Sequence, residues 1–284
     1  MNIKNLKIRL FGIVKNFRDY ELTADPFFRY ITLNKTDNIN KYFCTFAAGF
    51  GEKLNILERM AHDTHWFDDL ICFNADERNL SEIGLDEKSK EFIFSNKRGF
   101  GYWLWKPYFV KFCLSQVPEN SIICYADAGM EMSKNGTVIF EQLIQMAYDH
   151  DGLFFDMPFI EKNWTKKSVL DQFPQVDRNS RQIQANFFIL KKNERTIALL
   201  DDWIKYASAD EFNNIDDRVG TEALTFIEHR HDQSLLSCLV KNYGMKTIPQ
   251  VDSFDRRLYK ENVDWINRYP FHSLRSKSSI TYFK

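Results

Sequence analysis

Short apolar runs alternate along the chain with segments whose apolar residues recur at helical spacing. The runs that predict strands are 41–50, 69–74, 121–126, 152–155, 184–190 and 247–251. The segments that predict helices are 52–62, a stretch that starts at 87, 108–114, 137–148, 193–206 and 231–243. Strands that alternate with helices in this way predict an α/β fold with a mixed, mostly parallel sheet flanked by helices.

No internal repeat, low-complexity segment or linker rich in proline, glycine and serine interrupts this pattern. We therefore expect a single domain over residues 41–284, with residues 1–40 as an N-terminal extension packed on it. Residues 1–20 mix basic and apolar side chains. Such a mixture fits a packed strand or helix, and it also fits peripheral attachment to an anionic membrane surface.

One predicted strand ends on a single carboxylate. The sequence Ser-Ile-Ile-Cys-Tyr-Ala is followed by Asp127, Ala128 and Gly129. Ligands of α/β sheets bind at the carboxyl ends of strands, and two small residues leave room for a ligand to approach the backbone. Taken alone, an aspartate at a strand end is equally typical of a turn or a helix cap.

A second informative segment, 97–107, contains two glycines, several aromatic residues and a proline around Arg98 and Lys106. Arginine and lysine are the side chains that meet phosphate oxygens. The two tryptophans of the segment, Trp103 and Trp105, fit either the core or a binding surface. The first strand also ends in small residues before a helix, an order that suits nucleotide binding.

Composition excludes several classes of function. The net charge is −1, with 38 basic and 39 acidic residues, so no overall positive field would recruit nucleic acid. The five cysteines are widely spaced and include no Cys-x-x-Cys pair, which favours buried thiols in a reducing compartment over a zinc site. We see neither a transmembrane stretch nor a signal-peptide pattern and expect a cytoplasmic protein.

The segments around Trp105 and Asp127 together resemble GT-A-fold nucleotide-sugar glycosyltransferases, whose fold is Rossmann-like. Gly-Phe-Gly-Tyr-Trp-Leu-Trp-Lys-Pro, a helix and Tyr-Ala-Asp-Ala-Gly follow one another as in bacterial enzymes that build capsules and surface polysaccharides. In that family an Asp-x-Asp signature holds the cation that bridges the diphosphate of the donor, and here Gly129 replaces the second aspartate. The resemblance implies a UDP- or GDP-sugar donor, a carbohydrate or glycolipid acceptor, and Mn²⁺ or Mg²⁺.

The same resemblance assigns the donor side of the site. Asp127 would hold the metal ion, and the diphosphate would be neutralised by Arg98, Lys106 and Lys277. The remaining donor-binding residues would be Ala47, Ala48, Gly49, Ala128 and Gly129.

The C-terminal half resembles the glycogenin and lipopolysaccharide galactosyltransferase group. There, a strand with an asparagine precedes an Asp-Gln pair that opens a helix, which matches Asn186, Asp232 and Gln233 and implies their catalytic roles. By the same resemblance His272 would be a second metal ligand. The residues expected on the acceptor sugar are Trp105, His229, Arg230 and His231. Asp232 also fits a plain helix cap, and inversion or retention of configuration stays open.

Two other classes of function compete with this interpretation. A non-catalytic carbohydrate-binding or assembly protein on a degenerate transferase fold fits the missing second aspartate, since fold alone does not determine function. A phosphohydrolase of the haloacid dehalogenase type also places an aspartate at a strand end. Its chemistry needs a second aspartate where Gly129 stands, so this class is disfavoured.

Overall fold

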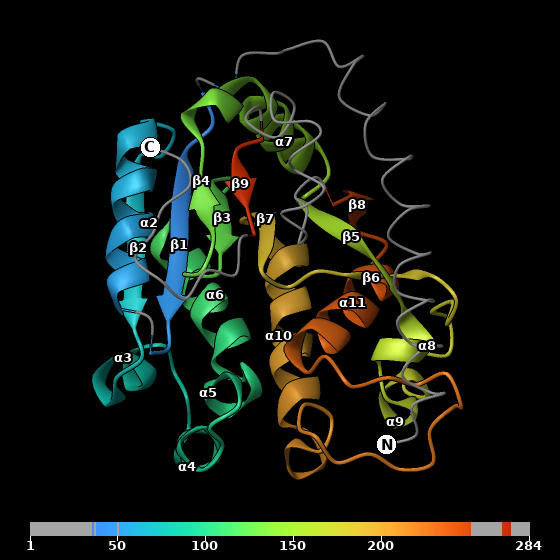
Figure 1. Ribbon diagram of the computed structural model, residues 1–284. Coiled ribbons are helices and arrows are strands. Elements are labelled where there is room, and N and C mark those ends of the chain that lie inside the picture. Colours follow the sequence, from blue (N-terminus) through green and yellow to red (C-terminus); the bar gives the residue numbers. More distant parts are fainter. Residues whose placement is uncertain (1–35, 37, 50, 251–268, 274–284) are drawn as a thin grey trace.

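The computed structural model describes residues 36, 38–49, 51–250 and 269–273. Its centre is a seven-stranded sheet in the order β2-β1-β3-β7-β5-β6, with β8 paired to β5 (Figure 1). The strands are β1 Lys41–Ala47, β2 Asp69–Asn74, β3 Ile122–Ala126, β5 Gly152–Ile160, β6 Arg181–Ile183, β7 Phe187–Lys191 and β8 Lys246–Pro249. Within the described residues, only β6 and β7 run against the other strands of this sheet. The expected α/β fold with a mixed, mostly parallel sheet is confirmed.

Helices cover both faces of the sheet. One face packs against α3 Glu77–Glu82, α4 Glu87–Ser95, α6 Trp105–Gln116, α10 Glu194–Ser208 and α11 Asp232–Asn242. The opposite face packs against α2 Gly51–Thr64 and α7 Thr137–Asp149. The shorter helical segments are α5 Gly99–Tyr102, η2 Lys134–Gly136, α8 Glu161–Trp164, α9 Lys167–Leu170 and η3 Asp210–Phe212.

Strand β3 packs against helices on both faces of the sheet. Ile123 and Tyr125 belong to the apolar cluster of α6 and α10, whereas Ile122 and Cys124 belong to that of α2 and α7. Side chains of a strand point alternately to the two faces, and all five residues of β3 are buried. A continuous apolar run is the pattern expected of such a doubly covered strand.

Several element boundaries differ from the sequence-based expectations. Strand β2 spans 69–74 as predicted, but β7 begins at Phe187 instead of 184, and α6 begins at Trp105 instead of 108. Strand β5 continues to Ile160, well past the predicted end. The sequence did not reveal α3, α8, α9 or β6, because each is too short to establish a periodicity.

A second, two-stranded sheet joins β4 Glu131–Met132 to β9 Phe271–His272. It brings residues 269–273 beside the chain that follows β3. No helix in the described parts of the chain is long and apolar enough to cross a membrane. Lys277, almost all of the expected N-terminal extension and its proposed membrane attachment lie outside the described residues.

Candidate functional site

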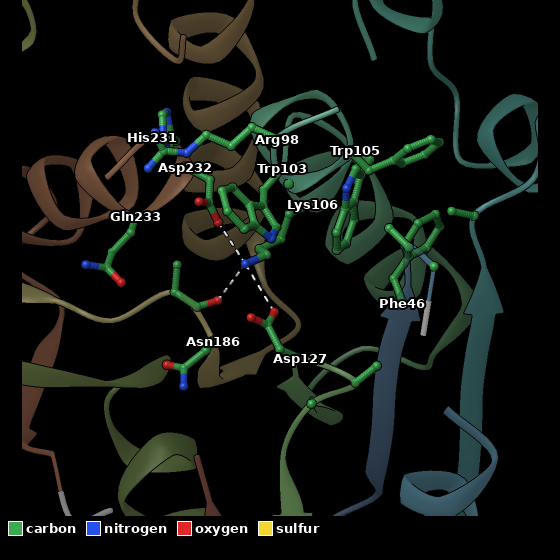
Figure 2. A pocket seen from close by; sticks show the side chains of 18 of the residues that line it. Phe46, Arg98, Trp103, Trp105, Lys106, Asp127, Asn186, His231, Asp232 and Gln233 are labelled. Carbon is green, nitrogen blue, oxygen red and sulfur yellow. Dashed lines mark hydrogen bonds and ion pairs between the residues drawn. The ribbon is translucent and has the colours of Figure 1, made fainter. Parts of the chain in front are cut away.

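A pocket of about 880 Å³ opens at the carboxyl ends of β1, β2 and β3. The rest of its wall comes from the segment that leads into α6, residues 185–186 before β7, the start of α11 and Ser273 after β9 (Figure 2). The lining residues are Phe46, Ala48, Gly49, Ala75, Lys97, Arg98, Gly99, Phe100, Trp103, Trp105, Lys106, Asp127, Ala128, Gly129, Met130, Ala185, Asn186, Arg230, His231, Asp232, Gln233 and Ser273. This is the edge of an α/β sheet at which ligands bind.

The ammonium of Lys106 lies between two carboxylates in the pocket wall. Its Nζ is 2.7 Å from Oδ2 of Asp232 and 3.2 Å from Oδ1 of Asp127, and it donates to the carbonyl of Ala185 at 3.1 Å (Figure 2). Tyr125 donates from its hydroxyl to the same Oδ1 of Asp127 at 2.7 Å. The Lys106 side chain is 2% exposed and that of Asp127 is 33% exposed. The cluster therefore joins a buried cation to a carboxylate that reaches the pocket.

Burial and charge act against each other in this cluster. Burial alone would lower the pKa of Lys106, but Asp127 and Asp232 outweigh it, so the pKa of Lys106 is raised. Burial raises the pKa of Asp232 to about 6, against the opposing effect of Lys106. Because two carboxylates share one ammonium, Lys106 offsets only part of the cost of burying the charged form of Asp232.

Lys106 occupies an unusual position in its helix. It is the second residue of α6, where the helix dipole disfavours a cation, whereas Pro107 is well tolerated in the first turn. In α11, by contrast, the first residue is Asp232, whose negative charge is favoured at the N-terminal end of a helix. A lysine placed against the local preference indicates that its two carboxylate partners determine the position.

The segment before α6 forms a left-handed turn. The φ angles of Gly99, Phe100, Gly101, Tyr102 and Trp103 are 56°, 50°, 75°, 52° and 61°. A Cβ on Gly101 would lie 2.5 Å from Cα of Ile93, so no larger residue fits there. Left-handed backbone is unfavourable for residues other than glycine and clusters at functional sites. The turn presents Phe100 and Trp103 to the pocket.

His231 packs against this turn and directly precedes Asp232. Its ring centroid lies 4.8 Å from that of Tyr102 and 5.8 Å from that of Trp103. Nδ1 donates to the carbonyl of Ile215 at 2.7 Å, and burial lowers the pKa of His231 to about 4, so the ring is neutral. Its backbone, at φ 54° and ψ −120°, lies in a region that glycine favours. His231 thus holds the start of α11 in a strained conformation.

Buried polar atoms without partners also face this region. Oδ1 of Asn186 and Nε1 of Trp105 are buried, and neither has a hydrogen-bond partner among the described residues. Asn186 donates from Nδ2 to Oγ of Ser273 at 2.8 Å, which leaves its oxygen as an acceptor. The Trp105 ring stacks on Phe46 with centroids 4.3 Å apart. Buried polar atoms normally have partners, so these two are candidates for contact with a ligand.

The described residues do not assemble a divalent-metal site around Asp127. No group of three or more histidine, cysteine, aspartate or glutamate residues in these parts of the chain is placed to hold an ion. His272 does not line the pocket; its Nε2 donates to the carbonyl of Tyr269 at 2.9 Å, and burial lowers its pKa to about 4. The Mn²⁺ or Mg²⁺ requirement stays a prediction.

Comparison with known proteins gives matches in structure but none in sequence. No protein-family model matches the chain, and no curated protein matches its sequence.

One similar structure is a glycosyltransferase involved in the glycosylation of the major capsid of PBCV-1, with a TM-score of 0.46 and 9% identity over 84% of this chain and 95% of that chain. Mouse xyloside xylosyltransferase 1 gives a TM-score of 0.43 and 9% identity over 83% and 97% of the two chains. The galactosyltransferase LgtC, in complex with donor and acceptor sugar analogues, gives a TM-score of 0.42 and 12% identity over 81% of this chain and 86% of that chain. Each is a glycosyltransferase, the group that the sequence motifs resemble. At scores and identities this low, the activities of those proteins do not define the chemistry of this pocket.

Most of the residues singled out from the sequence meet in the pocket. The expected residues that line it are Ala48, Gly49, Arg98, Trp105, Lys106, Asp127, Ala128, Gly129, Asn186, Arg230, His231, Asp232 and Gln233. Trp105 is nevertheless almost fully buried, which limits the sugar-stacking surface expected of it.

Besides His272, two expected residues in the described parts of the chain do not line the pocket. Ala47 is buried in an apolar cluster with Leu54 and Ala128. His229 was expected on the acceptor sugar, but its ring is buried and both ring nitrogens have partners in the protein. Nε2 donates to the carbonyl of Asn214, and Nδ1 accepts from the backbone N–H of Lys166. In this structure His229 therefore has no free ring nitrogen with which to bind an acceptor sugar.

Several lining residues were not predicted from the sequence. Lys97 and Phe100 lie in the recognised segment and were detectable from it. Ser273 also lies in a recognised segment, but only its neighbour His272 was predicted to be a site residue. The carbonyl of Ala185 left no signal, because a backbone group contributes nothing to a side-chain motif.

Proposed function

We propose that this chain transfers a sugar from a UDP- or GDP-linked donor to a carbohydrate or lipid-linked glycan acceptor in the synthesis of a surface polysaccharide or lipopolysaccharide. The observation that carries the proposal is the cluster of Lys106, Asp127 and Asp232 in the wall of a pocket at the carboxyl ends of three strands. Charges held fixed in a sheltered pocket stabilise charge that develops during a reaction.

The exposed cations of the pocket suit the diphosphate of such a donor. Lys97 has no ion-pair partner among the described residues and lines the pocket. Arg98 pairs with Asp217 at 2.9 Å and with Glu228 at 3.7 Å, and all three side chains are exposed. Exposed ion pairs contribute little, so phosphate oxygens can replace these carboxylates. Arginine binds phosphate through two parallel hydrogen bonds.

Asp232 is the carboxylate we assign to the reacting sugar. In the transfer, the bond between the anomeric carbon and the diphosphate breaks and an acceptor oxygen bonds to that carbon. If configuration inverts, Asp232 takes the proton of the acceptor hydroxyl. If configuration is retained, the departing diphosphate takes that proton and Asp232 stabilises the positive charge at the anomeric carbon. Asn186, through its unpartnered oxygen, and Gln233 would bind sugar hydroxyls.

Donor binding is tested by thermal unfolding with a panel of nucleoside diphosphates, their monophosphates and their sugar conjugates. A ligand at about 100 times its dissociation constant stabilises by about 2.7 kcal/mol. We expect a uridine or guanosine diphosphate to raise the melting temperature more than the monophosphate does. The double variant Lys97→Ala/Arg98→Ala should lose this difference, whereas Arg78→Ala, an exposed position outside the pocket, should keep it.

Transfer is tested by the release of nucleoside diphosphate from the donor that binds. We expect Asp232→Asn to retain donor binding and to lose most of the release. Wild-type protein that binds a sugar or its conjugate without any release would instead support a non-catalytic carbohydrate-binding protein. If no nucleotide or nucleotide sugar in the panel binds, the proposed function is rejected.

A further inference from the structure

Three oxygen atoms from separate segments surround the Lys106 ammonium. They are Oδ1 of Asp127 after β3, Oδ2 of Asp232 at the start of α11, and the carbonyl oxygen of Ala185 before β7, at 3.2, 2.7 and 3.1 Å (Figure 2). We call these three atoms the oxygen cage. The aromatic rings of Trp105 and Tyr125 lie next to it, with centroids 5.9 and 5.5 Å from Nζ. The cation thus lies among oxygens and aromatic faces and away from water.

The oxygen cage consists of the ligand types that hard divalent cations prefer, namely carboxylate and carbonyl oxygens. Two carboxylates that converge on one point repel each other unless a cation lies between them. In this chain the side chain of Lys106 supplies that cation, and its covalent attachment to α6 keeps the cation in place. A metal ion at the same point would displace a buried ammonium and leave it unpaired, which is strongly unfavourable.

Among the described residues, the surroundings of the oxygen cage offer no competing set of metal ligands. Oδ1 of Asp127 already accepts from Lys106 and Tyr125. Gly129 stands where the related signature has its second aspartate, and a Cβ there would meet nothing within 4 Å. His272, the other expected ligand, does not line the pocket. In the described parts of the chain, Lys106 is therefore the cation best placed to offset the two carboxylates.

We propose that the Lys106 ammonium is the resident cation of this site, so that a nucleoside diphosphate binds in the pocket without a divalent metal ion. The oxygen cage becomes a divalent-metal site only when the ammonium is removed. The first half rests on the proposed function for the identity of the ligand, and the second half depends on the cage alone.

The cage is tested by measuring Mn²⁺ binding to the protein without nucleotide. Binding is detected as a loss of the electron paramagnetic resonance signal of free Mn²⁺. We expect no specific binding to the wild type and specific binding to Lys106→Ala, which vacates the cage. Lys106→Met is the matched control, because it removes the same charge while its side chain still fills the space. In Lys106→Ala/Asp127→Asn the affinity should fall at least about tenfold, since even residues that only support a metal ligand are worth that much.

Thermal unfolding gives a second measurement on the same variants. Lys106→Ala leaves the buried carboxylate of Asp232 and the partly exposed carboxylate of Asp127 without their cation, and it should melt at a lower temperature than the wild type. Mn²⁺ should restore part of this loss in Lys106→Ala and none in Lys106→Met. If Lys106→Ala folds only when Mn²⁺ is present, the proposal is supported; if Mn²⁺ neither binds to it nor aids its folding, the metal-cage half is overturned.

The nucleotide half is tested with wild-type protein and the diphosphate identified by the thermal panel, in the presence of either a chelator or Mn²⁺. We expect dissociation constants that agree within about twofold. Binding that requires Mn²⁺ and disappears in Asp127→Asn overturns the resident-cation proposal while leaving the proposed function intact. If no nucleotide binds under either condition, the proposed function fails, and the Mn²⁺ measurement on Lys106→Ala still decides the nature of the cage.

Discussion

The carboxyl of Asp232 shows how burial at one residue affects the stability of the fold. Burial raises its pKa to about 6 in spite of the nearby Lys106 ammonium. The value in an unfolded chain is about 4. Because the folded pKa is the higher one, the contribution of Asp232 to stability is complete below about pH 4 and is lost as the pH rises through about 6.

We therefore expect Asp232→Asn to become more stable relative to the wild type as the pH rises from about 4 to about 7. The variant still leaves Lys106 paired with Asp127. Urea unfolding of both proteins at several pH values measures the difference in free energy of unfolding. A difference that stays constant or falls over this range would show that the carboxyl is not buried as described.

His231 allows backbone strain to be separated from side-chain contacts. Its φ and ψ of 54° and −120° suit glycine, whereas its ring contacts Tyr102, Trp103 and Ile215. Ala keeps the strain and loses the ring, while Gly loses the ring and relieves the strain.

Strained backbone of this kind costs about 1 to 3 kcal/mol. We expect His231→Ala to destabilise the protein by about that much more than His231→Gly, as measured by urea unfolding. At an ordinary helical position the order is reversed, because alanine is preferred there to glycine. Equal or reversed stabilities would contradict the described conformation.

At the scale of elements, the left-handed turn before α6 depends on its glycines. Gly101 has φ 75° and lies so close to Ile93 that an added Cβ would approach the backbone to 2.5 Å. Gly101→Ala should therefore lower the free energy of unfolding by several kcal/mol, through strain and overpacking of about 1 to 3 kcal/mol each. Gly129→Ala is the matched control, because a Cβ there meets nothing within 4 Å. Calorimetry that found similar losses in the two variants would refute this account.

The sequence predicted the long elements better than the short ones. The apolar runs of β1 and β3 are long because both faces of these strands are covered, and this pattern is visible in the residues alone. Residues 184–186 were predicted as the start of β7 but lie outside that strand, and the carbonyl of Ala185 accepts from Lys106 instead of a neighbouring strand. Segments of three or four residues, such as α8 and β6, are too short for any period to appear.

Individual residues of the site were predicted from the sequence, but the contacts between them were not. Lys106, Asp127 and Asp232 each stood out through a motif, yet their shared ion pair joins residues up to 126 positions apart in sequence (232 − 106) and depends on how the sheet is assembled. His229 and His231 are both buried and their ring centroids lie 5.5 Å apart, yet only His231 lines the pocket, and this difference also depends on tertiary packing.

At the scale of the whole molecule, the buried cysteines can show whether the chain unfolds as one domain. Cys44 in β1, Cys113 in α6, Cys124 in β3 and Cys238 in α11 are all buried. Burial raises the pKa of Cys44, Cys124 and Cys238, which further reduces their reactivity. If residues 41–284 form one domain, we expect these four thiols to become reactive over the same range of urea concentration.

Brief alkylation at each urea concentration, followed by peptide mass spectrometry, measures this for each thiol. Cys72 is partly exposed and serves as the internal reference, although the pKa of its thiol is raised to about 12 by burial. Exposure of Cys238 at a clearly lower urea concentration than Cys44 and Cys124 would indicate two separately folding units.

The position of β7 has a consequence for biosynthesis. This strand lies between β3 and β5, both of which leave the ribosome before it does. Until residues 187–191 emerge, each of those two earlier strands has an unpaired edge on the side that β7 will fill. Open edges of apolar strands are templates for association with other chains. A premature stop within the preceding loop should therefore yield an aggregating product, and nascent chains of that length are where chaperones would be most needed.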